Sequence, residues 1–295
     1  MDFTFGTGET FAILSALSWS IGAFIYGSVN KKISSFVINF LAAFSGLIFQ
    51  LFVILFFGDF SKIFLVDLKI FSLIALIAIT GYIIGRTLYI ESIKLVGVST
   101  ALPLTSITPL FTFVLAVIFY NEVITPLLIT GTVIIIIGVW ILNIQQNKDI
   151  TERKNFRNGV IFAITAAMLW SISHVTVKYV LMYADIFYVN TIRITVQVTI
   201  MSIILIAQNK FLNLFKINVR DIVPISLGGI FSYFFYVVFF LSSLEMIGIA
   251  RATPLSRIYP LFTFILAIIF LKETFTYVKL IGTIVIVSGV VLITI

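Results

Sequence analysis

The sequence contains one apolar helix twice. Residues 109–122 are PLFTFVLAVIFYNE and residues 260–273 are PLFTFILAIIFLKE, so the two copies stand 151 residues apart. The rest of the chain aligns with itself at the same offset without a gap. The residues that keep this offset include Trp19 and Trp170, Asn39 and Asn190, Tyr82 and Tyr233, Pro103 and Pro254, Glu122 and Glu273, and Gly138 and Gly289. Apolar helices often match by composition, but these residue types sharing one offset indicate an internal duplication.

The composition predicts an integral membrane protein. Hydrophobic residues make up 61% of the chain and charged residues 11%, whereas soluble domains carry roughly 25% charged residues to face water. The net charge is +7. Its basic residues are scattered between apolar runs, which is typical of topology signals and lipid headgroup contacts rather than of nucleic-acid binding.

Ten apolar runs are long enough to cross a bilayer, which takes about 20 residues per helix. We expect spans near residues 11–29, 36–57, 70–92, 99–120, 124–143, 158–181, 186–207, 221–244, 250–271 and 276–294. The longest polar stretch lies in the middle, at 143–158. The sequence therefore predicts an all-α integral membrane fold with a first five-helix repeat at 1–145, a linker at 146–157 and a second five-helix repeat at 158–295.

The number of spans in each half has a topological consequence. Five is odd, so the second half enters the membrane upside down relative to the first. Inverted repeats around a central cavity are typical of secondary transporters, with the binding site near the midplane. Channels also contain inverted repeats. The even total places both termini on the same side of the membrane. Counting Lys and Arg would put both termini outside, and we leave open which side they face.

The segment Gly-Val-Ser-Thr-Ala-Leu-Pro at 97–103, the helix after it and the glycines at 131 and 138 resemble the EamA-like branch of the drug/metabolite transporter superfamily. The second copy resembles it equally, so the match covers nearly the whole chain. The resemblance implies ten helices around a cavity and transport by alternating access. It implies little about the substrate, because relatives move amino acids, nucleotide sugars, sugar phosphates, purines and drugs.

Three arginines lie at membrane depth, away from the ends of the expected spans, where a charged side chain is costly unless it faces a cavity or a partner. Arg86 shares a helix face with Tyr82 and Tyr89, and Arg257 lies between two prolines that free backbone carbonyls. We expect both arginines, and the two tyrosines that flank Arg86, to line the cavity. Arg193 shares a face with Asn190 and Gln197, and its alternatives are a cavity role and a structural role at helix ends.

Further cavity candidates come from aromatic, polar and unmatched positions. They are Trp19, Trp170, His174, Tyr233, Tyr236 and Ser106. His174 is the only histidine, so it cannot form a metal site, and its alternatives are an interhelical hydrogen bond and a proton relay. Ser106 is the residue that aligns with Arg257, which makes this pair the clearest chemical difference between the two copies.

Glu122 and Glu273 end the repeated helix and precede the last helix of each half. A carboxylate there can cap free backbone N–H groups at the positive end of a helix dipole. We expect both glutamates to be structural.

The charges that lie at membrane depth are mainly positive, which favours a substrate with a carboxylate or phosphate group. We therefore expect a transporter of small metabolites such as amino acids, an exporter or exchanger in the plasma or inner membrane, coupled to a proton or a counter-substrate. Efflux of drugs or cationic compounds and channel-like permeation are the alternatives. The sequence contains no enzyme motif and no cysteine, so we expect no enzymatic activity, no cofactor and no metal. It is compatible with a monomer.

Overall fold

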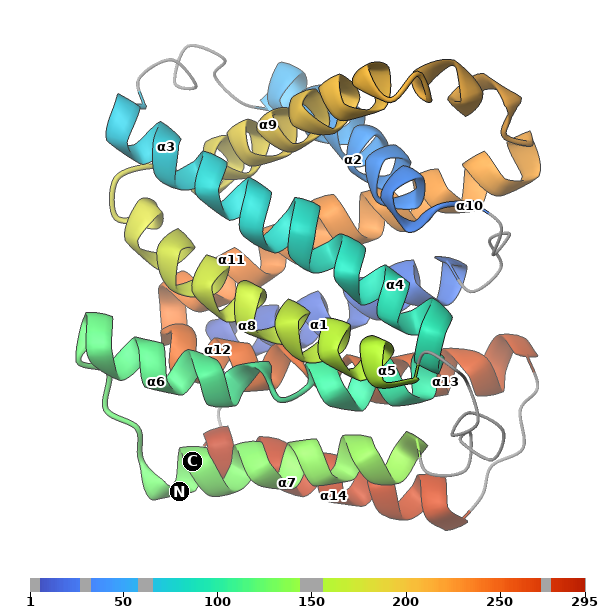
Figure 1. The fold of residues 1–295 in the computed structure, drawn as a ribbon. Coiled ribbons are helices and arrows are strands. Elements are labelled where there is room, and N and C mark those ends of the chain that lie inside the picture. Colours follow the sequence, from blue (N-terminus) through green and yellow to red (C-terminus); the bar gives the residue numbers. More distant parts are fainter. Residues whose placement is uncertain (1–5, 27–32, 58–65, 144–155, 272–276, 295) are drawn as a thin grey trace.

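A computed structural model describes residues 6–26, 33–57, 66–143, 156–271 and 277–294 (Figure 1). These residues contain helices and no strands. The first half contains α1 (Thr7–Tyr26), α2 (Ser35–Phe57), α3 (Leu68–Ile77), η2 (Ala78–Gly85), α4 (Arg86–Val96), α5 (Val98–Thr105), α6 (Thr108–Tyr120) and α7 (Pro126–Asn143). The second contains α8 (Phe156–Leu181), α9 (Ile186–Ala207), η4 (Phe211–Lys216), α10 (Val219–Gly229), η5 (Ile230–Phe235), α11 (Tyr236–Ile247), α12 (Ile249–Ser256), α13 (Tyr259–Leu271) and α14 (Tyr277–Thr294). Most of the expected linker lies outside the described residues.

Among the described residues, eight helical stretches are long and apolar enough to cross a membrane, and two shorter apolar helices cover Pro126–Leu142 and Leu280–Thr294. Their outer faces carry large apolar side chains that are exposed on the isolated chain. Examples on α2 and α6 are Ile48, Phe52, Val114 and Ile118, each 55–64% exposed. A soluble protein could not leave this much apolar surface in contact with water.

Several long stretches are interrupted at positions related by the repeat offset. Wide π-helical turns form η2 between α3 and α4, and η5 between α10 and α11. Carbonyl groups in such turns need partners, and asparagines of the repeat supply them. Asn39 Nδ2 donates to Tyr82 O (2.8 Å), and Asn190 Nδ2 donates to Tyr233 O (3.2 Å). The repeated asparagines therefore support equivalent interruptions in the two halves.

The proline-flanked helices break at equivalent points as well. One stretch divides into α5 and α6 and the other into α12 and α13, in both cases between its two prolines. Serines next to the repeated tryptophans bind the carbonyls beside the breaks. Ser171 Oγ donates to Thr108 O at 3.0 Å, and Ser20 Oγ donates to Tyr259 O at 2.5 Å. The repeated Trp-Ser pair thus ties α8 to the first break and α1 to the second.

Helices α7 and α14 pack against each other along one edge of the molecule (Figure 1). Their contact depends on glycines. A Cβ atom built on Gly138 would lie 2.7 Å from Ile286 Cγ1 and 2.8 Å from Ile286 N. Because a backbone atom cannot move aside as a side chain can, the two helices can approach this closely only with glycine there.

We expect Gly138→Leu to destabilise the protein by about 1–3 kcal/mol, the usual cost of overpacking a close contact. Thermal unfolding in detergent would measure the change. The control is Ile137→Leu, at a neighbouring residue on the apolar outer face that is 48% exposed, for which we expect a change of less than about 0.5 kcal/mol. Equal melting temperatures for the two variants would contradict the proposed packing.

Candidate functional site

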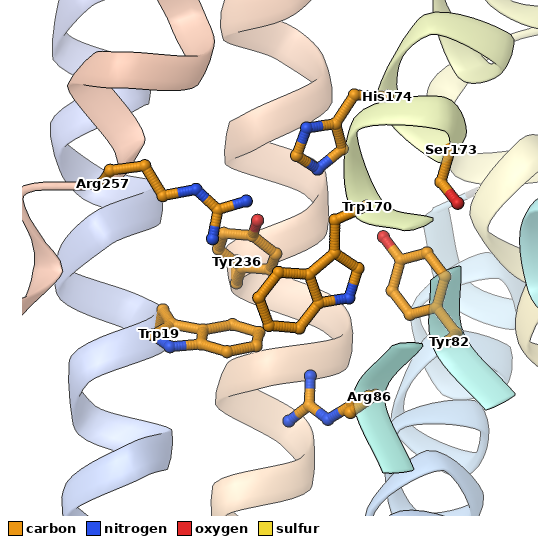
Figure 2. Close-up of a pocket in the computed structure, with 8 residues that line it drawn as sticks. All are labelled: Trp19, Tyr82, Arg86, Trp170, Ser173, His174, Tyr236 and Arg257. Carbon is orange, nitrogen blue, oxygen red and sulfur yellow. The ribbon is translucent and has the colours of Figure 1, made fainter. Parts of the chain in front are cut away.

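A pocket lies between the two halves of the chain, where α1, α8, α11 and the α12–α13 break meet the end of η2 (Figure 2). It contains about 330 Å³ of empty space, including space at its opening. Eight residues line it: Trp19, Tyr82, Arg86, Trp170, Ser173, His174, Tyr236 and Arg257. Apart from Tyr82, none of these residues is more than 7% exposed. The pocket is therefore largely enclosed by its own walls.

Aromatic rings form most of the pocket wall. The Trp19 and Trp170 rings meet edge to face at 5.9 Å between centroids, and Tyr236 lies 4.8 Å from Trp19. In Figure 2 the two indoles lie between the guanidinium groups of Arg257 and Arg86. Arg86 Cζ lies 4.6 Å from the centre of the Trp19 ring, and Arg257 Cζ lies 5.1 Å from the centre of the Trp170 ring. Each arginine thus contacts a different indole.

The two tryptophans differ in their hydrogen bonding although the repeat makes them equivalent. Trp170 Nε1 donates to Gly81 O at 3.0 Å, which holds the indole on the π-helical turn η2. Trp19 Nε1 is buried and has no hydrogen-bond partner. In the second half the position of Gly81 is taken by Ser232, whose hydroxyl accepts a 2.9 Å hydrogen bond from Arg86 Nη2. Arg86 therefore binds Ser232 in η5, at the position equivalent to Gly81, which binds Trp170 in η2.

Arg257 is located in the break between α12 and α13. Its side chain is 3% exposed, yet its Nε and Nη2 atoms have no hydrogen-bond partner. His174 Nδ1 is also buried without a partner, and the His174 ring packs on Phe240 at 4.6 Å. Unsatisfied buried polar groups are costly. The pocket therefore has unused hydrogen-bonding capacity near Arg257.

Arg193 lies outside the pocket wall, in a buried polar network with Asn190 and Gln197. It donates to Asn190 Oδ1 from Nη2 (2.6 Å) and Nε (3.2 Å), and its Cζ lies 3.6 Å from the centre of the Tyr82 ring. Gln197 Nε2 donates to Tyr233 Oη at 3.1 Å. This arginine is occupied by protein groups and supports Tyr82, which lines the pocket, from behind.

The structure brings seven of the eleven cavity candidates into one pocket wall and places the other four elsewhere. Arg193 and Tyr233 belong to the polar network, Tyr89 packs against Trp170 at 5.2 Å, and Ser106 is fully buried at the α5–α6 break. Tyr233 also contacts Arg86, at 4.4 Å from its ring centre. These four residues do not line the pocket.

Ser173 lines the pocket although the sequence analysis did not select it. The residue that aligns with it in the first half is Gly22, so this is another position at which the two copies differ. Its hydroxyl lies 3.2 Å from Thr80 Oγ1. A search for polar residues that replace glycine between the copies would have found it.

Glu122 caps a helix, but not the one that follows it in the sequence. Its carboxylate accepts hydrogen bonds from the backbone N–H groups of Ile249 (3.2 Å) and Ala250 (2.9 Å), at the start of α12. It also pairs with Lys178 at the end of α8. We expected it to cap the helix that follows it, and the structure instead joins α6, α8 and α12 through this one side chain. Glu273 lies outside the described residues.

The pocket wall contains no acidic residue. Within the described ranges, the ion pairs are Lys94–Glu91, Lys178–Glu122 and Arg251–Glu9, and none of them includes a pocket arginine. The same residues contain no group of three or more His, Cys, Asp or Glu side chains that could hold a metal ion. Among these described residues, the positive charge of Arg257 is therefore not neutralised by an ion pair.

Comparison with known proteins gives a consistent picture. A family model described as the EamA-like transporter family matches residues 6–144 and again residues 157–295. The chain is 22% identical over 283 residues to a protein of Archaeoglobus fulgidus named "Uncharacterized transporter", with 95% of both chains covered. It is 24% identical over 298 residues to "Protein LicB" of Haemophilus influenzae, with 96% of both covered. A solved crystal structure shares its fold with a TM-score of 0.76 at 16% identity, covering 97% of this chain and 95% of the other.

Proposed function

Because the chain belongs to the EamA-like transporter family and is a multi-pass membrane transporter, we propose that it works as a secondary transporter. In this proposal it exports or exchanges small metabolites across the cell membrane by alternating access. The enclosed pocket between the two halves is the substrate site. The two halves around it open in turn to the two sides of the membrane.

The proposal includes ten transmembrane helices arranged as two inverted repeats. The eight long apolar stretches and the two shorter apolar helices together make ten. The equivalent bonds of Ser20 and Ser171, and those of Asn39 and Asn190, support a duplicated architecture. With five spans in each half, the repeats are inverted, and such halves can exchange their open and closed conformations.

The charge of the pocket supports the substrate class. Arg86 and Arg257 are at most 4% exposed and share the pocket with no acidic side chain. A buried charge without a counter-charge is costly, and a carboxylate or phosphate on the substrate would neutralise it. We propose a carboxylate- or phosphate-bearing metabolite, such as an amino acid. The observation that carries the proposal is the buried guanidinium of Arg257, which has two nitrogens without a hydrogen-bond partner in a wall whose described residues include no acid.

An amino acid also matches the rest of the wall. The rings of Trp19, Trp170 and Tyr236 present faces that attract a substrate ammonium group. His174 Nδ1 can accept a hydrogen bond from that group when the imidazole is neutral. We propose that the driving force is a proton gradient or a counter-substrate, with His174 as the candidate proton carrier because it lines the same pocket.

We expect saturable counterflow of zwitterionic or anionic amino acids in proteoliposomes that contain the purified protein. Preloaded vesicles should accumulate labelled substrate transiently, because exchange through one site couples influx to efflux. The screen should cover amino acids, organic acids, nucleotides and organic cations, with protein-free liposomes as the control. Flux that grows linearly with concentration and shows no counterflow would contradict the transporter proposal and favour channel-like permeation.

A second candidate substrate is an organic cation, which the aromatic wall favours. Trp19, Trp170 and Tyr236 together could surround an ammonium group. The two guanidinium groups in the same wall would repel a cation without a carboxylate. Counterflow of organic cations in preference to amino acids and organic anions would decide for this alternative.

A further inference from the structure

The three buried arginines of the central region differ in how far the protein already satisfies them. Arg193 donates to Asn190 and Gln197, and Arg86 donates to Ser232. Arg257 instead has two guanidinium nitrogens, Nε and Nη2, that are buried without a hydrogen-bond partner. Arg193 and Arg86 can therefore serve to hold protein groups together. Arg257 still has N–H donors that a ligand could bind.

The two free nitrogens of Arg257 form one edge of the guanidinium group. The N–H bonds on that edge are parallel, and their spacing matches the two oxygens of a carboxylate, which such an edge binds in bidentate fashion. Two other buried polar atoms of the same pocket also lack partners, namely Trp19 Nε1 and His174 Nδ1. These groups come from three separate segments, α1, α8 and the α12–α13 break.

We propose that Arg257 is the residue that binds the carboxylate of the substrate, through Nε and Nη2 together. This inference rests on the proposed transport function and refines its substrate class from anions in general to carboxylates. Arg86 then acts as a positioning residue. Its Cζ lies 4.6 Å from the centre of the Trp19 ring, so the guanidinium packs on this ring and fixes it in the pocket wall.

The position of Arg257 explains why the binding residue is found in only one half. It occupies the irregular turn between α12 and α13, where the helix is interrupted and the side chain is directed into the pocket (Figure 2). The equivalent residue, Ser106, is fully buried at the first break. Duplication supplied two equivalent breaks, and only one of them carries a charged donor.

The test uses the intrinsic fluorescence of the pocket tryptophans. The chain has three tryptophans, and Trp140 is 47% exposed on α7, so Trp140→Phe leaves emission from Trp19 and Trp170 alone. We expect iodide, an anionic quencher, to quench this variant more strongly than neutral acrylamide. We expect acetate to protect against iodide at concentrations at which chloride does not.

Two substitutions at Arg257 separate its charge from its geometry. In the Trp140→Phe background, Arg257→Gln should lower iodide quenching at least threefold and abolish protection by acetate. Arg257→Lys should keep iodide quenching, because the positive charge remains. It should lose protection by acetate, because lysine lacks the two parallel N–H bonds that bind a carboxylate in bidentate fashion. Arg251→Gln is the matched control on α12, the helix that ends just before Arg257, at a side chain that is 42% exposed and paired with Glu9, and it should behave as the parent.

The proposal is overturned if Arg257→Lys retains protection by acetate, or if no variant changes iodide quenching. If Arg257→Gln does not fold, Arg257→Lys alone decides. The counterflow assay distinguishes a failure of the proposed transport function from a failure of the carboxylate site. Acetate protection that depends on Arg257, in a protein without counterflow, would leave the carboxylate site in place and reject the transporter mechanism.

Discussion

Replacing Asn190 with leucine is expected to destabilise the protein by about 3–5 kcal/mol, because it removes two hydrogen bonds to a buried charged group, which are worth about 1.5–3 kcal/mol each. Asn190 Oδ1 accepts two hydrogen bonds from Arg193, whose side chain is 2% exposed. Asn190 Nδ2 also donates to Gln50 Oε1 and to Tyr233 O. Leucine fills a similar volume but supplies neither the acceptor nor the donor.

The repeat offers a matched control for this prediction. Asn39→Leu is the same substitution at the equivalent position, where the amide donates to Tyr82 O and Thr87 Oγ1 and accepts from Tyr233 Oη. No hydrogen bond of Arg193 involves Asn39 in the described network, so we expect a smaller loss of about 1–3 kcal/mol. Thermal and denaturant unfolding in the same detergent would measure both. Equal losses would show that the charge of Arg193 does not depend on Asn190.

Replacing Glu122 with alanine is expected to open the end of the pocket where α6, α8 and α12 meet. Glu122 caps two N–H groups of α12 and pairs with Lys178. Losing the cap and the partly exposed ion pair should cost about 2 kcal/mol. A shift of about 1.4 kcal/mol already changes the ratio of two conformations tenfold. If this end acts as a gate, the open form should rise by that factor or more.

The contact that Glu122 stabilises, between α6 and α12, is not repeated between the equivalent helices of the two halves. Helix α6 packs against α12, whereas the equivalent pair, α5 and α13, makes at most marginal contact in the described part of the chain. Figure 1 shows α6 and α12 toward the left and α5 and α13 toward the right. The Glu122 contacts therefore lie at the end where α6 of the first half packs against α12 of the second, which is the expected place for a gate in the proposed mechanism.

Cysteine labelling would measure the opening, because the chain contains no cysteine of its own. Ser173→Cys places one thiol in the pocket wall at a residue that is 3% exposed. We expect a membrane-impermeant maleimide to react with it about tenfold faster or more when Glu122→Ala is added. Lys178→Met should give a smaller increase, since it removes the ion pair and leaves the cap.

The control for labelling is Glu9→Ala, which removes a looser pair with Arg251 at 3.9 Å between charged atoms. It should leave the labelling rate of the thiol near that of the parent. Labelling that is unchanged by Glu122→Ala would show that this carboxylate does not hold the pocket closed. A rise in all variants, including Glu9→Ala, would indicate general loosening of the fold instead.

Some features of the site were accessible from the sequence because they depend on residue type and offset. The prolines on either side of Arg257 pointed to an opened helix at that place, and two of the three arginines at membrane depth, Arg86 and Arg257, lie in the pocket wall. The helix capped by Glu122 was misjudged because the sequence shows only its neighbours along the chain. Its partners Ile249 and Ala250 lie more than 120 residues away.

What the sequence determined by itself is local or periodic: apolar helices, their duplication at one offset, and membership of the transporter family. A helix in lipid must satisfy its backbone hydrogen bonds internally, so composition and length are enough to predict it. Only the tertiary structure decided which arginine remains available for a ligand. Arg86, Arg193 and Arg257 carry the same charge, and they differ because Ser232 and Asn190 satisfy the first two while Nε and Nη2 of Arg257 have no partner. Such differences depend on contacts between segments that are far apart in the chain, so a local sequence pattern cannot predict them.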